Sequence, residues 1–164
     1  MAKKPFLTPD TILSILAATP TRIAALTNDL SPAQLHGTSA PGEWSLNDIL
    51  AHLRACADVW GDAMRTMIAE DHPTIRAINP QAWIEQRDYR KLECRASFDA
   101  FARQRAELLA MLEPLSPEDW TRTAIVTGVG APLVRTVQEV ANRMARHERA
   151  HVSHLERFVA ALGD

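Results

Sequence analysis

Cysteine is scarce in this sequence, with only Cys56 and Cys94 among 164 residues. Two cysteines cannot supply the framework of several disulfides that holds small secreted domains together, so we expect both side chains to be free thiols. The opening residues, Met-Ala-Lys-Lys-Pro-Phe-Leu, also lack the apolar run of a signal peptide. Both observations favour a cytoplasmic protein.

An excess of charge of either sign is missing as well. Lys and Arg number 18, Asp and Glu number 20, and the formal net charge is −2. This balance offers no electrostatic basis for binding nucleic acid or an anionic membrane surface. No apolar segment reaches the length needed to span a bilayer. We therefore expect neither nucleic acid nor a membrane among the partners of this protein.

The sequence does contain enough apolar residues for one sizeable core. Hydrophobic residues make up 46% of the chain and charged residues 23%, which is an ordinary balance for a globular protein. A chain of this length commonly folds as one domain. No low-complexity tract marks a boundary, so we predict a single domain over residues 1–164.

Apolar residues recur at helical spacing in four long segments. Two of these segments begin with capping sequences, Ser45-Leu46-Asn47-Asp48 and Thr136-Val137-Gln138-Glu139. Pro20 lies inside the first segment, where it must kink the helix or restart it. The predicted long helices begin near Thr8, Ser45, Cys94 and Thr136.

The connections between these helices predict how they run. About twenty residues separate the second helix from the third, a length that suits a crossover between helices pointing the same way. No segment shows a convincing strand pattern, although residues 123–132, rich in Thr, Val and Gly, fit an extended loop or a small hairpin. The sequence therefore predicts an all-α protein built as a four-helix bundle.

The last predicted helix carries an unusual group of histidines. His147, Glu148 and His151 form the pattern H-E-x-x-H, which binds zinc in one class of metalloproteases. Residues four apart on a helix stand about 40° apart and roughly 6 Å along the axis, so both imidazoles can reach one ion. His154 follows on the same face.

These histidines fall within a stripe of apolar residues that we expect to face the core. Burying imidazoles is costly unless each has a partner, and a divalent metal is the simplest shared one. The alternative is a helix whose histidines are half exposed to water and bind nothing. The stripe consists of Leu133, Val137, Val140, Met144, Phe158 and Leu162.

A third ligand must come from upstream of the pair. Metalloproteases usually take it from well downstream, but only 13 residues follow His151, and His154 and Arg157 occupy the places where the extended motif needs Gly and His. His52 lies on the predicted core face of the second long helix, whereas His36 and His72 fall in predicted loops. We therefore predict His52 as the third ligand.

Three neutral imidazoles would leave coordination positions for water or substrate, as in catalytic metal sites. Such donors suit zinc, nickel or iron(II). We expect Glu148 and His154 to take part in catalysis, for example as proton relays. Glu148 could also accept a ligand's N–H or be a surface charge, and His154 could be a fourth ligand. Cys56, one turn from His52, is expected to be a buried thiol, with metal contact as the alternative.

Four short sequences, taken together, carry a family resemblance. They are Gly42-Glu43-Trp44-Ser45, Ile49-Leu50-Ala51-His52-Leu53, Thr136-Val137-Gln138-Glu139 and His147-x3-His151. In this order and spacing they resemble the DinB-like superfamily, which includes YfiT-like proteins and thiol-dependent transferases. The resemblance implies an up-down-down-up bundle with a long crossover after the second helix. It also implies a divalent metal on His52, His147 and His151, whereas relatives often have Gln at the position of His154.

The resemblance further implies a function. It suggests a metal-dependent transferase that activates a low-molecular-weight thiol for attack on an electrophile, since a thiol on a metal loses its proton near neutral pH. A hydrolase using metal-bound hydroxide would need the same ligands. A non-catalytic dimer that binds metal or a small ligand is a further alternative. We also expect a homodimer, with Trp83 and Tyr89 in the crossover as candidate contact residues.

Overall fold

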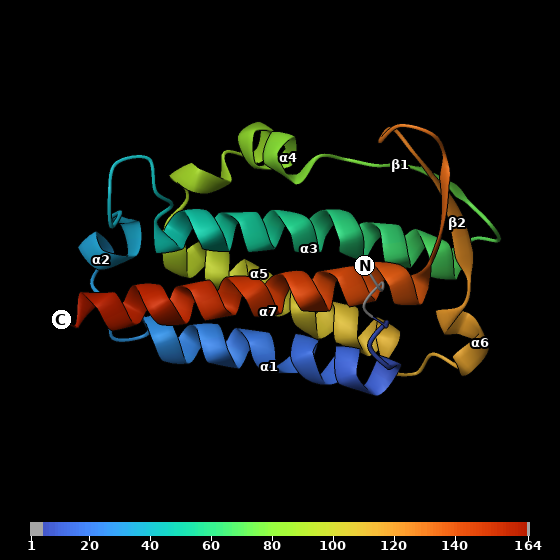
Figure 1. Ribbon diagram of the computed structural model, residues 1–164, viewed down its shortest axis with the longest axis horizontal. Coiled ribbons are helices and arrows are strands. Elements are labelled where there is room, and N and C mark those ends of the chain that lie inside the picture. The colour runs from blue at the N-terminus through green and yellow to red at the C-terminus, as the bar shows by residue number, and fades with distance from the viewer. Residues whose placement is uncertain (1–4, 164) are drawn as a thin grey trace.

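The computed structural model describes residues 5–163. Its four long helices lie side by side and form the predicted four-helix bundle (Figure 1). In Figure 1, α1 and α7 run in one direction and α3 and α5 in the other, which confirms the up-down-down-up order. The long helices are α1 (Pro9–Thr27), α3 (Leu46–Ala69), α5 (Cys94–Leu112) and α7 (Val137–Leu162).

Hydrogen bonds of the predicted capping sequences fix where α3 and α7 begin. The Ser45 hydroxyl accepts from the Asp48 backbone N–H at 3.0 Å, and the Asp48 carboxylate accepts from the Ser45 backbone N–H at 2.9 Å. Thr136 and Glu139 make the same pair of bonds at 3.1 and 2.8 Å. Each pair satisfies two backbone donors that a helix start leaves free, so the start of each histidine-bearing helix is well defined.

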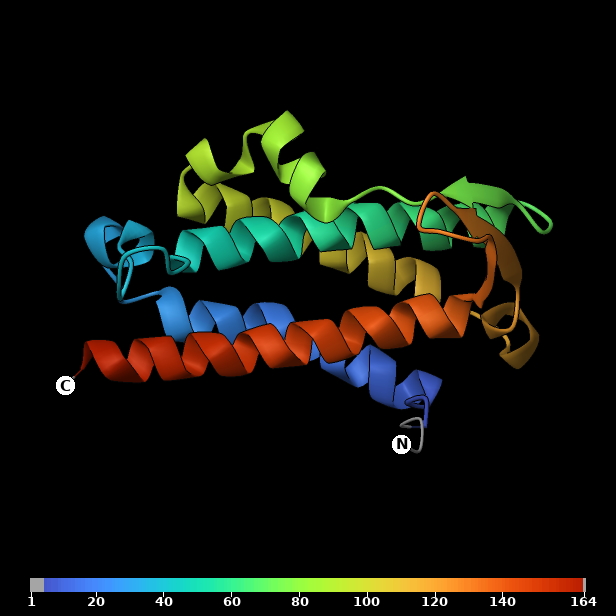
Figure 2. The same cartoon turned by 45° about the horizontal axis from the view of Figure 1, so that its top comes forward.

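The crossover between α3 and α5 lies outside the bundle, alongside α3 (Figure 2). It contains α4 (Pro80–Arg87) and the 3₁₀ turn η1 (Tyr89–Lys91). Asp58 on α3 accepts hydrogen bonds from the Trp83 indole N–H at 3.0 Å and from the Tyr89 hydroxyl at 2.5 Å. Both aromatic residues therefore attach the crossover to its own bundle. Tyr89 is buried there, whereas Trp83 is half-buried and stays a candidate contact residue of the predicted dimer.

A small sheet closes the end of the bundle where α7 begins (Figure 1). Strand β2 (Thr123–Thr127) pairs antiparallel with β3 (Leu133–Thr136), so the expectation of no strand is wrong. The segment does form a hairpin, but its second strand lies beyond the predicted residues 123–132. The third strand, β1 (Thr74–Arg76), comes from the crossover and pairs parallel with β2. The Val137 N–H donates to the Arg122 carbonyl at 3.0 Å, which ties the start of α7 to the segment before the sheet.

Two short helices complete the described chain, α2 (Pro32–His36) and α6 (Pro117–Trp120). Within residues 5–163, no helix is both long enough and apolar enough to cross a membrane.

Candidate metal centre

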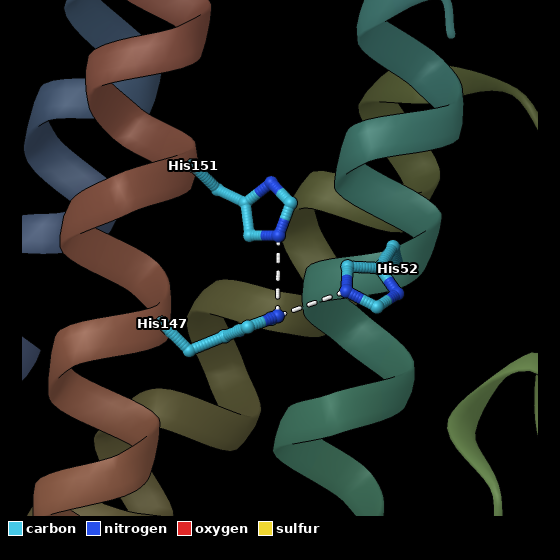
Figure 3. Close-up of side chains that lie close together, drawn as sticks. All are labelled: His52, His147 and His151. Carbon is cyan, nitrogen blue, oxygen red and sulfur yellow. Dashed lines mark hydrogen bonds between the residues drawn. The ribbon is translucent and has the colours of Figure 1, made fainter.

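Three histidine side chains from two antiparallel helices point at one another (Figure 3). The Nε2 atom of His147 lies 2.9 Å from Nε2 of His52 and 3.1 Å from Nε2 of His151. His52 comes from α3, and the other two come from neighbouring turns of α7. The structure thus brings together the three residues that the sequence predicts as ligands, and we call this group the histidine site.

The orientation of α7 about its own axis places the rings of His147 and His151 at the edge of the core. The buried face of α7 includes Val137, Ala141, Met144, Ala145, Val152, Leu155 and Phe158. His147, His151 and His154 lie beside this face and are half-buried. Leu133, predicted as the first residue of the stripe, lies in β3 and not on α7, and both Leu133 and Leu162 are exposed. The site therefore lies between two helices, with its rings partly accessible to solvent.

The spacing of the nitrogens fits a metal ion. A metal–nitrogen bond of about 2.0–2.1 Å with bond angles of roughly 90–110° separates two ligand nitrogens by about 2.9–3.4 Å. The observed separations of 2.9 and 3.1 Å fall in this range. Neutral imidazoles whose lone pairs point at one another stabilise one another little. A cation bound between them interacts favourably with every lone pair. The donor set and its geometry therefore suit a divalent ion.

Packing against two tryptophans orients the rings. Trp44, just before α3, has its ring centroid 5.2 Å from that of His52 and is nearly parallel to His151 at 6.5 Å. Trp60, two turns after His52 on α3, lies edge-on to His147 at 5.1 Å. Within residues 5–163, the buried Nδ1 atoms of His52 and His147 have no hydrogen-bond acceptor. Aromatic contacts thus fix ring positions that carbonyl or carboxylate acceptors fix in many metal sites.

The local environment keeps the three imidazoles neutral. Burial is the largest cause, and it lowers the pKa of His147 to about 3, with further lowering by the charges of His151, His52 and Arg143. Burial and the charges of His52 and His154 lower the pKa of His151 to about 4. The pKa of His52 is also lowered, by burial and by the charge of Arg90. Neutral rings at neutral pH have the lone pairs that a metal requires.

Acid is expected to destabilise the metal-free protein through these histidines. In the unfolded chain an imidazole regains a pKa near 6.5, whereas in the folded protein the pKa of His147 is about 3 and that of His151 about 4. Between these values the unfolded state binds more protons, so the free energy of unfolding falls as the pH drops from about 6.5 toward about 4. Urea unfolding at about pH 7 and about pH 5 measures the loss.

The variant His147→Phe serves as the control for this loss. It removes one of the titrating groups, so its free energy of unfolding should fall less between the two pH values than that of the unchanged protein. An equal fall in both proteins would show that other groups are responsible.

Cys56 lies next to the histidine site without joining it. Its Sγ is 3.7 Å from Nε2 of His52, but the clustered ligand atoms in the described chain are the three imidazole nitrogens alone. Burial raises the pKa of the thiol to about 12, although the charge of Arg143 acts in the opposite direction. The structure agrees with the expectation of a buried thiol.

Glu148 does not join the ligand cluster of the histidine site, although the sequence predicts a catalytic role for it. Its side chain is buried, and both carboxylate oxygens accept from the Arg105 guanidinium of α5, with Nη1 donating to Oε2 at 2.7 Å. Successive side chains of an α-helix are rotated by about 100° about its axis, so the side chain next to a ligand histidine leaves the helix in a different direction. Because both of its oxygens are bound to Arg105 in the core, Glu148 stabilises the packing of the bundle. This finding corrects its assignment as a proton relay.

His154 lies one turn beyond His151 and is half-buried. Its charge contributes to lowering the pKa of His151, which places it near the site. Its predicted roles, as a fourth ligand or as a proton acceptor, stay predictions. Trp44 and Trp60 are the neighbours that sequence reasoning did not assign to the site. The i, i+4 spacing of His52, Cys56 and Trp60 is the signal that could have placed Trp60 there.

Comparison with known families agrees with this architecture. A sequence model of the DinB superfamily matches residues 15–155. The chain belongs to the DinB superfamily. No curated protein matches it by sequence.

Solved structures of the same fold are distant in sequence. YfiT from Bacillus subtilis, described as a probable metal-dependent hydrolase with an unusual four-helix bundle topology, aligns with a TM-score of 0.83 and 16% identity over 99% of this chain and 93% of its own. A mycothiol-dependent maleylpyruvate isomerase aligns with a TM-score of 0.69 and 15% identity over 91% of this chain and 61% of its own. A DinB-like protein from Bacillus subtilis aligns with a TM-score of 0.64 and 16% identity over 94% and 92%. These likenesses show the shared fold.

Proposed function

We propose that this protein binds a divalent metal ion through His52, His147 and His151 and transfers a low-molecular-weight thiol to an electrophile. The observation that carries the proposal is the meeting of three Nε2 atoms, separated by 2.9 and 3.1 Å, between α3 and α7. All three donors are neutral, and the ligand cluster of the described residues contains no carboxylate. The name of the mycothiol-dependent isomerase supports a thiol as the small molecule.

A divalent ion on three neutral nitrogens would keep its full positive charge and thereby favour the thiolate form of a thiol. The protein would contribute a rigid and partly open setting for this chemistry. Trp44 and Trp60 pack against the rings of the histidine site, and these half-buried rings stay partly accessible to solvent. We propose His154, one turn from His151, as the side chain that accepts the proton.

A hydrolase is the alternative, and one comparison favours it. YfiT, with which the chain shares its fold along nearly its whole length, is described as a probable metal-dependent hydrolase. Hydrolysis by an activated water requires the same three donors and the same open position. A bundle that binds metal or a small ligand without turnover is the remaining alternative.

A cobalt(II) titration separates these functions. The cobalt-loaded protein is mixed with several small thiols while its visible and near-ultraviolet absorbance is recorded. We expect new absorbance and a saturable change, because sulfur replaces oxygen among the cobalt ligands. A spectrum that no thiol changes would remove the transferase proposal. Turnover of ester or amide substrates by the same sample would then decide between hydrolysis and simple binding.

Assembly and location stay predictions. We propose a twofold homodimer, as the family resemblance implies, and a cytoplasmic location. Light scattering that gives a monomer at high micromolar concentration would contradict the dimer. In a dimer, half-buried Trp83 is the better candidate contact of the two crossover aromatics, because Tyr89 is buried against its own bundle.

A further inference from the structure

Arg143 is a positively charged side chain beside the histidine site, and none of the carboxylates in the described part of the chain pairs with it. Arg143 precedes His147 by one turn on α7 and is exposed. Its Cζ lies 4.9 Å from the centroid of the Trp60 ring, and that ring lies 5.1 Å from the ring of His147, so guanidinium and imidazole are no more than 10.0 Å apart. Within residues 5–163, no carboxylate forms an ion pair with Arg143.

Two other charged side chains near the site, Glu148 and Arg90, already have partners of opposite charge. Both oxygens of Glu148 are taken by Arg105 in the core. At the other end of the site, Arg90 lies over Trp44 but is 3.6 Å from the Asp48 carboxylate. With a divalent ion on three neutral imidazoles, the site would carry the charge of the ion and that of Arg143 with no anion to balance them. Such a site favours an anionic ligand.

We propose that Arg143 binds a carboxylate of the small molecule whose reacting end meets the histidine site. This inference rests on the proposed function, and it specifies the substrate class as a thiol or electrophile that carries a carboxylate. The planar guanidinium can donate two parallel hydrogen bonds to a carboxylate. Trp60 holds the guanidinium by a cation–π contact and offers a flat apolar surface between Arg143 and His147. A short carbon chain spans this distance.

The first test compares two thiols that differ in one group. The cobalt-loaded protein is titrated with 3-mercaptopropionate and with 3-mercaptopropionamide, which has the same shape without the charge. We expect the acid to bind about tenfold more tightly, because a charge-assisted hydrogen-bonded pair contributes roughly that much. Arg143→Met should reduce the ratio to about one, and Arg143→Lys should restore part of it.

Arg149→Met is the matched control for this comparison. Arg149 is an exposed arginine of the same helix, but it follows His147 by two residues, or about 200° of rotation, and so leaves the helix on another side. Its replacement should leave the ratio unchanged. Equal affinity for acid and amide in the unchanged protein would overturn the inference, and so would a ratio that survives Arg143→Met. In either case, a cobalt spectrum that changes with thiols would still support the proposed function, so the two failures can be told apart.

A second measurement needs neither thiol nor metal. Succinate and the neutral succinamide are added to the metal-free protein while the indole N–H signal of Trp60 is followed by NMR, with Trp60→Phe used to assign it. We expect succinate alone to shift the signal, and Arg143→Met to abolish the shift. If succinate shifts the signal through Arg143 but no thiol changes the cobalt spectrum, the carboxylate site is supported and the thiol function is contradicted. No shift with succinate would overturn the site.

Discussion

Replacing His151 by alanine is expected to lower the affinity for a divalent metal by more than about a hundredfold, because even the loss of a group that only supports a ligand costs 10–100-fold. The Nε2 atom of His151 is 3.1 Å from that of His147, so its removal leaves two donors and an open side toward Trp44. Zinc titration against a chromophoric chelator measures the affinity, and elemental analysis measures the metal retained during purification.

His154→Gln is the matched control on the same helix. This change replaces a half-buried histidine one turn beyond His151 with glutamine, the residue that the family resemblance implies at this position. We expect its metal affinity to stay within a few-fold of that of the unchanged protein. If His154→Gln loses the metal as fully as His151→Ala, then His154 is a ligand. If His151→Ala keeps the metal, the histidine site is not a metal site.

Removing the charge of Glu148 is expected to destabilise the fold by about 3–5 kcal/mol, because it leaves the Arg105 guanidinium buried without its counter-ion. Both side chains of this pair are 2% exposed. Pro20 has no N–H to bond the Leu16 carbonyl, and Arg105 Nη1 donates to that carbonyl at 3.1 Å. One guanidinium therefore joins α1, α5 and α7. Urea unfolding of Glu148→Gln at neutral pH measures the loss.

A double variant distinguishes a lost contact from an unpaired charge. Arg105→Met combined with Glu148→Leu removes both charges and should recover most of the loss, although the Leu16 carbonyl then lacks its donor. Metal affinity in folded Glu148→Gln should be close to that of the unchanged protein, since the carboxylate is outside the ligand cluster and bound to Arg105. A stable Glu148→Gln protein that has lost metal or activity would return Glu148 to the catalytic group.

Local sequence determined the helices and the pairing of His147 with His151. Capping sequences at Ser45 and Thr136 supply hydrogen bonds within three residues, and the i, i+4 spacing fixes the relative position of two rings on one helix. The amphipathic pattern also placed His52 toward the core, which was enough to predict that it meets the pair. These features depend on neighbours in the chain, so the sequence alone specifies them.

Tertiary packing decided the rest. About 100° of helix separates His147 from Glu148, so the motif H-E-x-x-H is equally compatible with a carboxylate beside the metal or in the core. The packing of α7 against α1 and α5, including the Arg105 pair, places the Glu148 carboxylate in the core. Strand β1 likewise forms because it meets β2, some fifty residues along the chain, and three residues are too short for a periodic signal. Trp60 and Arg143 adjoin the site because the packing of α3 against α7 brings their turns to the same level. Such contacts between distant segments leave no local pattern in the sequence.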